Sequence, residues 1–124
     1  IGKEHEIRLE NCLSEKGVTF KTETTLREKG YDKTPDILLD MPIAADNFVI
    51  HWIESKALFA DDKSHRQYAN NQYLSYFNRF GTGLVIYWCG YVKSIIEIDE
   101  YKNKFLVKQE FPEIVPFNPD LIPI

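Results

Sequence analysis

Apolar residues recur along this chain with two different periods, and the changes between them predict the order of its helices and strands. Residues 3–16 have a helical spacing that places Leu9 and Leu13 on one apolar stripe, and Gly17 is suited to end that helix. Residues 18–24 then alternate between apolar and polar side chains, as a half-buried strand does. The first part of the chain therefore predicts a helix that leads into a strand.

Two further strands are predicted in the middle of the chain. After a helical turn over 25–30, a strand starts at residues 36–39 directly after Pro35, and a connection over 41–47 leads to a third strand over 48–57. Because side chains alternate along a strand, the third strand has two faces. One face is formed by Ile50, Trp52, Glu54 and Lys56. The other face is formed by Val49, His51, Ile53 and Ser55.

The second half of the chain predicts a long helix and a buried strand. The helix spans 65–80 with Ser64 as its N-cap, and the continuous apolar run over 84–88 is typical of a central strand. Residues 92–98 and 104–108 suggest a hairpin, and the proline-rich tail after it is expected to be irregular. The apolar side of the helix is formed by Ala69, Tyr73, Tyr76, Phe77 and Phe80. This order predicts an α/β fold, a mixed β-sheet flanked by α-helices.

Length and composition limit the possible classes of protein. The 124 residues, 44% of them hydrophobic, predict a single folded domain over 1–124 with its own core. The chain begins at Ile1 rather than Met, so we expect it to be a fragment of a longer protein. No apolar run approaches the roughly 20 residues that cross a bilayer, so no membrane segment is expected.

The formal net charge of −4 changes the expectation for nucleic-acid binding. It argues against a protein that binds nucleic acid through a basic surface alone. It does not exclude a nuclease, because a metal site gathers carboxylates. In a nuclease with this charge, additional affinity has to come from the metal, from another domain or from a protein partner.

The two cysteines, Cys12 and Cys89, do not form a disulfide framework. Cys12 lies within the first helical pattern and Cys89 ends an apolar strand, so both are expected to be small core residues. This usage fits a reducing, intracellular compartment, either nucleus or cytoplasm. Three scattered histidines without a C-x-x-C motif argue against a structural zinc site.

One constellation of residues indicates a specific chemistry. Glu6 lies on the first helix, Asp36 opens a strand after Pro35, and Glu54 and Lys56 lie on the next strand. We expect the acids and the lysine to meet at one end of the sheet. Paired carboxylates supply the hard oxygen ligands that Mg²⁺ or Mn²⁺ prefers, and the lysine supplies a cation beside the attacking water.

Simpler explanations exist for each of these residues. Asp36 also suits a turn, and Glu54 with Lys56 also suits a solvated strand edge, where an ion pair contributes little. The bulky residues on the same face favour a covered site, and a buried charge pair needs a reason. Glu10 competes with Glu6, one helical turn away.

The motifs also resemble known families. Glu6 on a helix, Pro35-Asp36 and Glu54-Ser55-Lys56, in this order, resemble the PD-(D/E)XK nuclease superfamily, and the region around residues 79–81 is similar to archaeal Holliday-junction resolvases. Residues 33–37 look like the signature of the TPD-motif proteins. Together with residues 51–56 and 78–88, they resemble the eukaryotic codanin-interacting nucleases.

These resemblances imply a restriction-endonuclease-like fold and a set of roles. Asp36, Glu54 and the backbone carbonyl of Ser55 are implied as metal ligands, Lys56 as the group that orients or deprotonates the attacking water, and Glu6 as an acid that holds a water bound to the metal. Gln72 and Tyr76 resemble a substrate-contacting pair on the following helix. His65 is a further candidate for a phosphate contact because it lies on the side of Gln72, although ordinary helix packing or a surface position also explains these three.

The implied function is a divalent-metal-dependent nuclease that cuts nucleic acid, DNA in particular, and leaves a 5′-phosphate and a 3′-hydroxyl. The resemblance also implies a protein partner, with codanin as the first candidate, and residues 91–124 are the expected contact surface. The alternative is a nuclease-fold interaction module, a codanin-binding adaptor with weak or absent catalysis.

Overall fold

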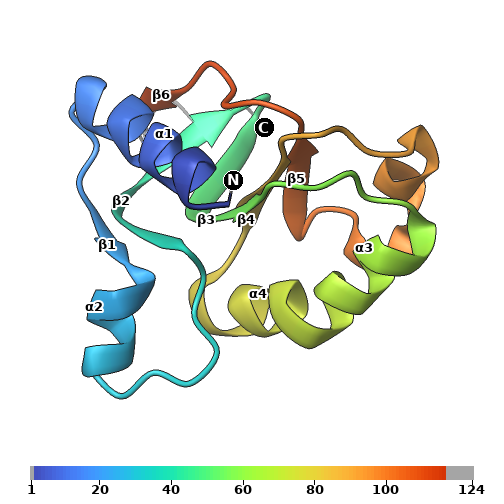
Figure 1. The fold of residues 1–124 in the computed structure, drawn as a ribbon, viewed down its shortest axis with the longest axis horizontal. Coiled ribbons are helices and arrows are strands. Elements are labelled where there is room, and N and C mark those ends of the chain that lie inside the picture. The colour runs from blue at the N-terminus through green and yellow to red at the C-terminus, as the bar shows by residue number, and fades with distance from the viewer. Residues whose placement is uncertain (1, 117–124) are drawn as a thin grey trace.

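A single mixed β-sheet organises residues 2–116, the part of the chain that the computed structural model describes (Figure 1). The strands follow the order β1-β2-β3-β4-β5, and β6 pairs with β2. The β1-β2-β3 part is antiparallel, whereas β3, β4 and β5 are parallel. The strands are β1 (Phe20–Thr22), β2 (Ile37–Ala45), β3 (Phe48–Lys56), β4 (Gly83–Tyr87), β5 (Phe105–Lys108) and β6 (Val115–Pro116).

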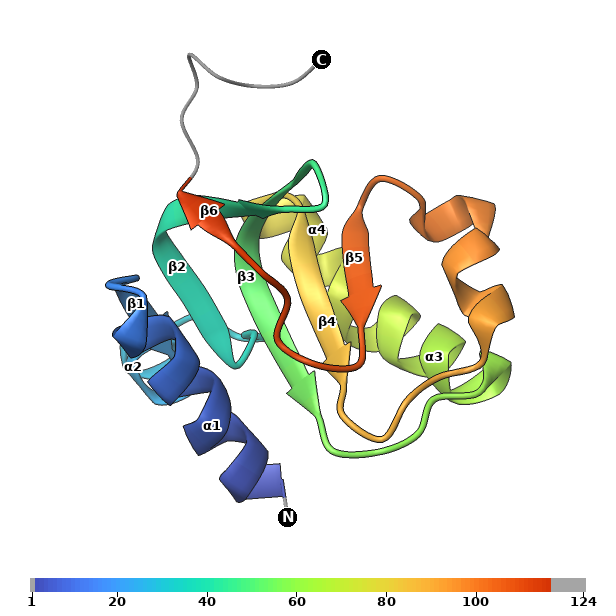
Figure 2. The same ribbon diagram turned by 90° about the horizontal axis from the view of Figure 1, so that it is seen from above.

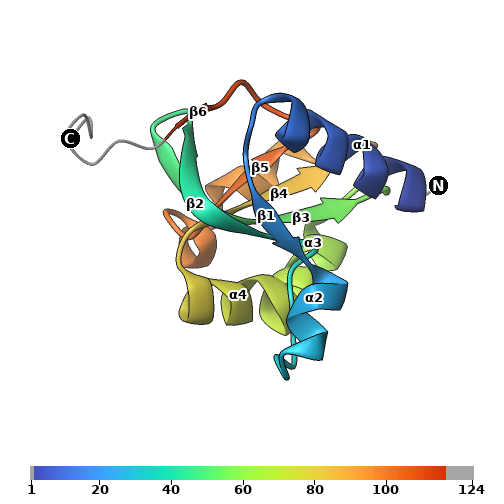
Figure 3. The same cartoon turned by 90° about the vertical axis from the view of Figure 1, so that its left-hand side faces the viewer.

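Helices cover both faces of this sheet, which confirms the predicted mixed α/β architecture (Figure 2). Helix α1 lies on one face, where Leu9 and Leu13 pack into one apolar core, while α3 and α4 lie on the opposite face over a second core around Trp52 (Figure 3). The α-helices are α1 (Gly2–Glu15), α2 (Glu23–Glu28), α3 (Asp62–Tyr68) and α4 (Leu74–Phe80). Among the described residues, no helix is long and apolar enough to cross a membrane.

The predicted connection over 41–47 is wrong, because β2 continues through most of it. β2 ends at Ala45, and only Asp46 and Asn47 form the turn to β3. Both turn residues have positive φ, 50° and 62°, which is the backbone of a tight two-residue hairpin. The pairing with β3 is irregular between Leu38 and Ile43, and an irregular site of this kind tolerates Pro42 inside a strand.

The long helix predicted over 65–80 is present, but it begins earlier and contains an irregular turn. Asp61, not Ser64, is the N-cap, since its side chain accepts a hydrogen bond from the Ser64 amide at 2.8 Å. A π-helical segment, Ala69–Tyr73, joins α3 to α4. Such segments re-aim side chains and are frequent at functional sites.

The Trp52 ring packs directly against the first residue of β4. A Cβ on Gly83 would meet the Trp52 ring at 2.1 Å, so the indole occupies space that only glycine leaves open. Its Nε1 donates to the carbonyl of Gly81 at 2.7 Å. Ile50, predicted on the same face as Trp52, instead packs with Ile53 in the core beneath α1.

The late hairpin predicted from 92–98 and 104–108 is also wrong. The first segment contains a short 3₁₀ helix, Lys93–Glu97, and a second one, Asp99–Tyr101, follows it. β5 pairs in parallel with β4. The tail expected to be irregular contributes β6, and residues 117–124 lie outside the described part.

The two cysteines differ from the prediction as well. Cys12 is half-buried and Cys89 is exposed, so Cys89 is not a core residue.

Candidate active site

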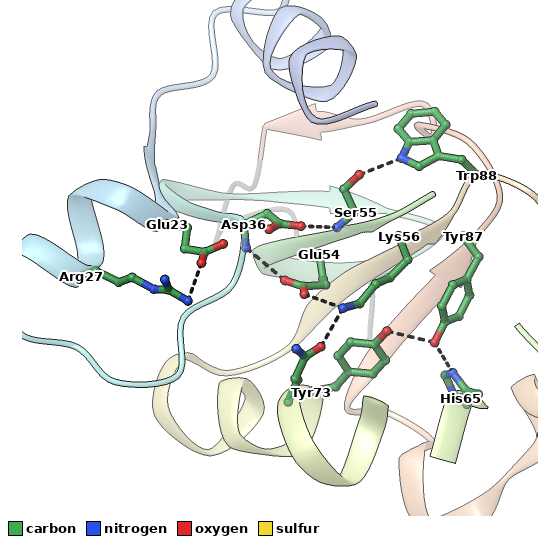
Figure 4. A network of polar contacts seen from close by, with 11 residues as sticks. Glu23, Arg27, Asp36, Glu54, Ser55, Lys56, His65, Tyr73, Tyr87 and Trp88 are labelled. Atoms are coloured by element: carbon green, nitrogen blue, oxygen red, sulfur yellow. Dashed lines mark hydrogen bonds and ion pairs between the residues drawn. The ribbon is translucent and has the colours of Figure 1, made fainter. Parts of the chain in front are cut away.

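The pairing of β2 with β3 brings the predicted acids together (Figure 4). Ile37, which starts β2, lies opposite Ile53 of β3, so Asp36 lies beside Glu54 and Ser55. The Asp36 amide donates to Glu54 Oε1 at 3.0 Å, and the Ser55 amide donates to Asp36 Oδ2 at 2.8 Å. The end of β3 therefore fixes both carboxylates against the strand that precedes it.

Lys56 lies on the same side and is held by three neighbours. Its Nζ lies 3.2 Å from Glu54 Oε2 and donates to Gln72 Oε1 at 2.8 Å. It also lies 4.4 Å from the centre of the Tyr68 ring, a favourable position for a cation. Glu54 is only 4% exposed, so this ion pair is largely removed from water.

Two further acids, Glu6 and Glu23, lie close to Asp36. Carboxylate oxygens of Glu6, Glu23 and Asp36 all lie within 4.8 Å of one another, and all three residues are half-buried. Glu54 is not in this group, because its two oxygens face the Asp36 amide and Lys56. Glu6 rather than Glu10 is thus the acid of α1 that lies at the site.

Glu23 is the residue that sequence reasoning missed. It begins α2 directly after β1, its amide donates to the Asp36 carbonyl at 3.2 Å, and its side chain pairs with Arg27 at 2.7 Å. The available signal is an acid in the first turn of a helix, but the alternation over 18–24 predicts a strand at Glu23. A strand boundary placed two residues later concealed this acid.

The site carries more negative charge than its surroundings neutralise. Burial, followed by the nearby charge of Glu54, raises the pKa of Asp36 well above its usual range. Burial also raises the pKa of Glu54, although Lys56 opposes that shift. These oxygens are hard ligands for Mg²⁺ or Mn²⁺, and a cation there would favour the charged forms of both buried carboxylates, so the donor set fits such a metal.

The three predicted substrate contacts have different outcomes. Gln72 reaches the site through Lys56, whereas Tyr76 is 2% exposed and packs against the Trp52 ring. His65 is fully buried, and its Nδ1 lies 2.6 Å from the Tyr87 hydroxyl. The prediction that His65 contacts phosphate is therefore wrong. The polar residue was mistaken for a surface group because its aromatic neighbours come from distant segments.

Comparison with known proteins gives a family for this arrangement. A family model described as a protein of unknown function with the TPD sequence motif matches residues 1–111. The chain belongs to this TPD family. Its Thr34-Pro35-Asp36 sequence ends at the central carboxylate of the site, and Thr34 is itself buried.

Curated relatives include proteins named "CDAN1-interacting nuclease 1". The Danio rerio protein is 53% identical over 113 residues, which cover 90% of this chain and 37% of the relative. The Homo sapiens protein is 50% identical over 113 residues, 90% of this chain and 39% of the relative. The chain thus spans less than two fifths of the length of these relatives.

A shorter similarity extends outside these nucleases. An uncharacterised protein of Acanthamoeba polyphaga mimivirus is 48% identical over 59 residues, 44% of this chain. No solved structure gives a significant match.

Proposed function

We propose that this chain is a metal-dependent nuclease domain of the PD-(D/E)XK type, with a restriction-endonuclease-like fold, that hydrolyses phosphodiester bonds of DNA. The supporting observation is the meeting of Asp36, Glu54 and Lys56 at the end of β3. Glu54 and Lys56 are 3.2 Å apart in a largely buried setting. Burying such charges is unfavourable for folding, so a chemical role accounts for them better than stability does. The nuclease names of the relatives agree with this role.

The proposed ligands of Mg²⁺ or Mn²⁺ are Asp36, Glu54 and the Ser55 carbonyl, with Glu6 and Glu23 completing the acidic surroundings. A divalent cation held there supplies charge neutralisation for the phosphate and acidifies the attacking water. Lys56, held by Glu54 and Gln72, presents its ammonium group to the negative charge that develops on the phosphate oxygens.

Cleavage of labelled DNA by the purified chain tests this proposal. We expect cutting with Mg²⁺ or Mn²⁺ and none after EDTA. Asp36→Asn, Glu54→Gln and Lys56→Ala should each lower the rate by about 100-fold or more, since the first two remove a metal ligand and the third removes the cation that faces the phosphate.

Asp40→Asn is the matched control, because Asp40 also lies on β2 but forms an exposed ion pair with Lys21. It should cut at the rate of the parent chain. Wild-type rates in all three site variants, with circular dichroism showing intact folds, would exclude the nuclease proposal.

A second function is favoured by the relatives' names and by an apolar surface patch. We propose that the chain also binds codanin, through the patch formed by Phe59, Val92 and Ile96, which are 56%, 38% and 53% exposed. Phe59 and Val92 are adjacent because the Val92 amide donates to the Ala60 carbonyl at 3.0 Å. Exposed apolar residues gathered in this way mark interaction surfaces.

Capture of purified codanin tests the patch. The double substitution Phe59→Asp and Ile96→Asp should abolish capture while DNA cleavage continues. Met41→Asp is the control, since Met41 is 70% exposed on β2, outside the patch. Undiminished capture by the double variant would place the interface elsewhere.

A further inference from the structure

A cavity of about 600 Å³ lies beside the acidic site, between α1 and the segments that follow β4 and β5. Its lining includes Arg8 and Cys12 of α1, Trp88 after β4 and Gln109 after β5. The volume falls within the range of roughly 300–1,000 Å³ that is typical of small-molecule sites. None of these four residues belongs to the proposed metal site.

Two hydrogen bonds connect the wall of this cavity to the central acid. Trp88 Nε1 donates to Ser55 Oγ at 2.9 Å, and the Ser55 amide donates to Asp36 Oδ2 at 2.8 Å (Figure 4). Helix α1 makes a second connection, because it presents Glu6 to the acids and Arg8 to the cavity. The acids and the cavity are thus connected through Ser55 and Trp88, so a nucleic-acid strand bound at the acids can continue towards the cavity.

The cavity combines an aromatic face with a cation. The Arg8 guanidinium lies 5.6 Å from the centre of the half-buried Trp88 ring, and the His5 ring lies 5.2 Å from it. Glu110 also lines the cavity, but among residues 2–116 no carboxylate lies within salt-bridge distance of Arg8. An aromatic face stacks on any base, and a guanidinium pairs with a phosphate.

We propose that this cavity binds one nucleotide of a single-stranded nucleic acid, with the base stacked on Trp88 and the adjoining phosphate paired with Arg8. The proposal rests on the nuclease function above and adds a substrate class to it. Single strands are specified because a base inside a duplex is stacked on its neighbours and has no free face. The contact is independent of sequence, since every base offers a ring face.

Binding is measured separately from cleavage in the Asp36→Asn background, with EDTA and a fluorescein-labelled oligo(dT). In this background, Arg8→Gln and Trp88→Ala should each weaken binding about tenfold by fluorescence anisotropy. Trp88→Phe keeps an aromatic face but loses the bond to Ser55, so it should retain most of the affinity. Lys63→Gln, which removes an exposed cation on α3, should leave binding unchanged.

Tryptophan emission gives a second readout. Trp52 is fully buried, so quenching by the oligonucleotide reports on Trp88. We expect quenching in the Asp36→Asn chain and none after Trp88→Phe. A blunt duplex of the same sequence should bind less tightly and quench less.

The outcomes separate this subsite from the nuclease proposal. Equal affinities for Arg8→Gln, Trp88→Phe, Trp88→Ala and the Asp36→Asn parent would overturn the subsite, as would equal binding of duplex and single strand or no binding at all. Loss of affinity in Arg8→Gln with no metal-dependent cutting by the unsubstituted chain would retain the subsite and exclude the nuclease.

Discussion

Two clusters of polar side chains lie near β3 and β4, and a fall in pH changes their contributions to stability in opposite directions. The acidic cluster holds Asp36 and Glu54, whose pKa values are raised by burial. The aromatic cluster holds His65, Tyr73 and Tyr87, and burial lowers the pKa of His65 to about 4. A fall in pH therefore neutralises the carboxylates of the acidic cluster, whereas it protonates His65 and places a charge in the aromatic cluster.

The clusters also differ in how far their polar groups are paired by hydrogen bonds or ion pairs within the cluster. In the aromatic cluster, the Tyr87 hydroxyl lies 2.6 Å from His65 Nδ1 and 3.0 Å from the Tyr73 hydroxyl, and all three groups are neutral near pH 7. In the acidic cluster, four carboxylates pair with two cations among residues 2–116, Lys56 and Arg27. In the aromatic cluster only His65 Nε2 is left without a hydrogen-bond partner among the described residues, whereas the acidic cluster has more carboxylates than cations.

The largest expected effect follows from neutralising one acid. The pKa values of Asp36 and Glu54 are raised above their ordinary 3.8 and 4.5, so the folded state retains protons that the unfolded state releases. The resulting stabilisation is present below about pH 4 and is lost as the pH rises. Asp36→Asn should therefore raise the melting temperature in EDTA at pH 7.5 by roughly 5 °C, since Asn still accepts from the Ser55 amide.

Addition of metal should reverse the order of the melting temperatures of the parent chain and Asp36→Asn. Mn²⁺ should raise the melting temperature of the parent chain and leave Asp36→Asn nearly unchanged, because the variant lacks a ligand. Asp40→Asn is the control, since its ion pair is exposed and its pKa is lowered, so it should gain nothing in EDTA. An unchanged or lower melting temperature of Asp36→Asn in EDTA would show that burial beside Glu54 does not raise the pKa of Asp36.

The sequence predicted the acidic cluster better than the aromatic one, for a physical reason. Asp36 directly precedes β2, and Glu54 and Lys56 lie on the neighbouring β3, so side-chain alternation and the tight hairpin suffice to bring them together. His65, Tyr87 and Tyr101 come from separate elements, and only tertiary packing joins them. A histidine in a polar stretch of sequence is therefore predicted to lie at the surface, because the sequence does not show that packing.

Prediction of the fold is limited in the same way, because elements that depend on distant contacts do not follow from the local pattern. The α1 helix, β3 and the buried β4 follow from local periodicity. The parallel placement of β5 depends on a crossover through two 3₁₀ helices, whose apolar spacing imitates a strand. Glu23 was hidden because alternation over 18–24 continues across the point where α2 begins.

The second expected effect tests the aromatic cluster. The pKa of His65 is lowered from 6.5 to about 4, so its contribution to stability is present above pH 6.5 and is lost as the pH falls towards 4. Between pH 7 and pH 5 this loss is about 2 kcal/mol. Urea denaturation at both pH values should show that loss in the parent chain relative to His65→Phe, which has no group to titrate.

Protonation of the acids stabilises the fold on acidification in both the parent chain and His65→Phe. The difference between the two proteins therefore reports on His65 alone. The same pH dependence in both would mean that His65 titrates normally and that the aromatic cluster admits water.

The third expected effect tests which acid of α1 belongs to the acidic cluster. Glu6 lies within 4.8 Å of Glu23 and Asp36, whereas Glu10 is one turn further along the helix. Glu6→Gln should lower kcat about tenfold with a modest loss of metal affinity, because the other ligands remain. Glu10→Gln should have the kcat of the parent chain. The reverse ranking would assign the role to Glu10.

The smallest effect separates two adjacent residues of the π-helical segment, one from each cluster. Tyr73 contacts the Tyr87 hydroxyl, and Gln72 contacts Lys56. Tyr73→Phe should destabilise the fold by about 1 kcal/mol in urea denaturation, because one buried hydrogen bond is lost while Tyr87 keeps His65 as a partner. Its cleavage rate should equal that of the parent.

Gln72→Ala should give the opposite result, a severalfold lower rate with little change in stability, since Lys56 loses one of the groups that orient it. If both substitutions changed rate and stability together, the two clusters would behave as one network rather than as a site and its support. A separation of the two effects at neighbouring positions would mean that the π-helical turn divides its side chains between catalysis and packing.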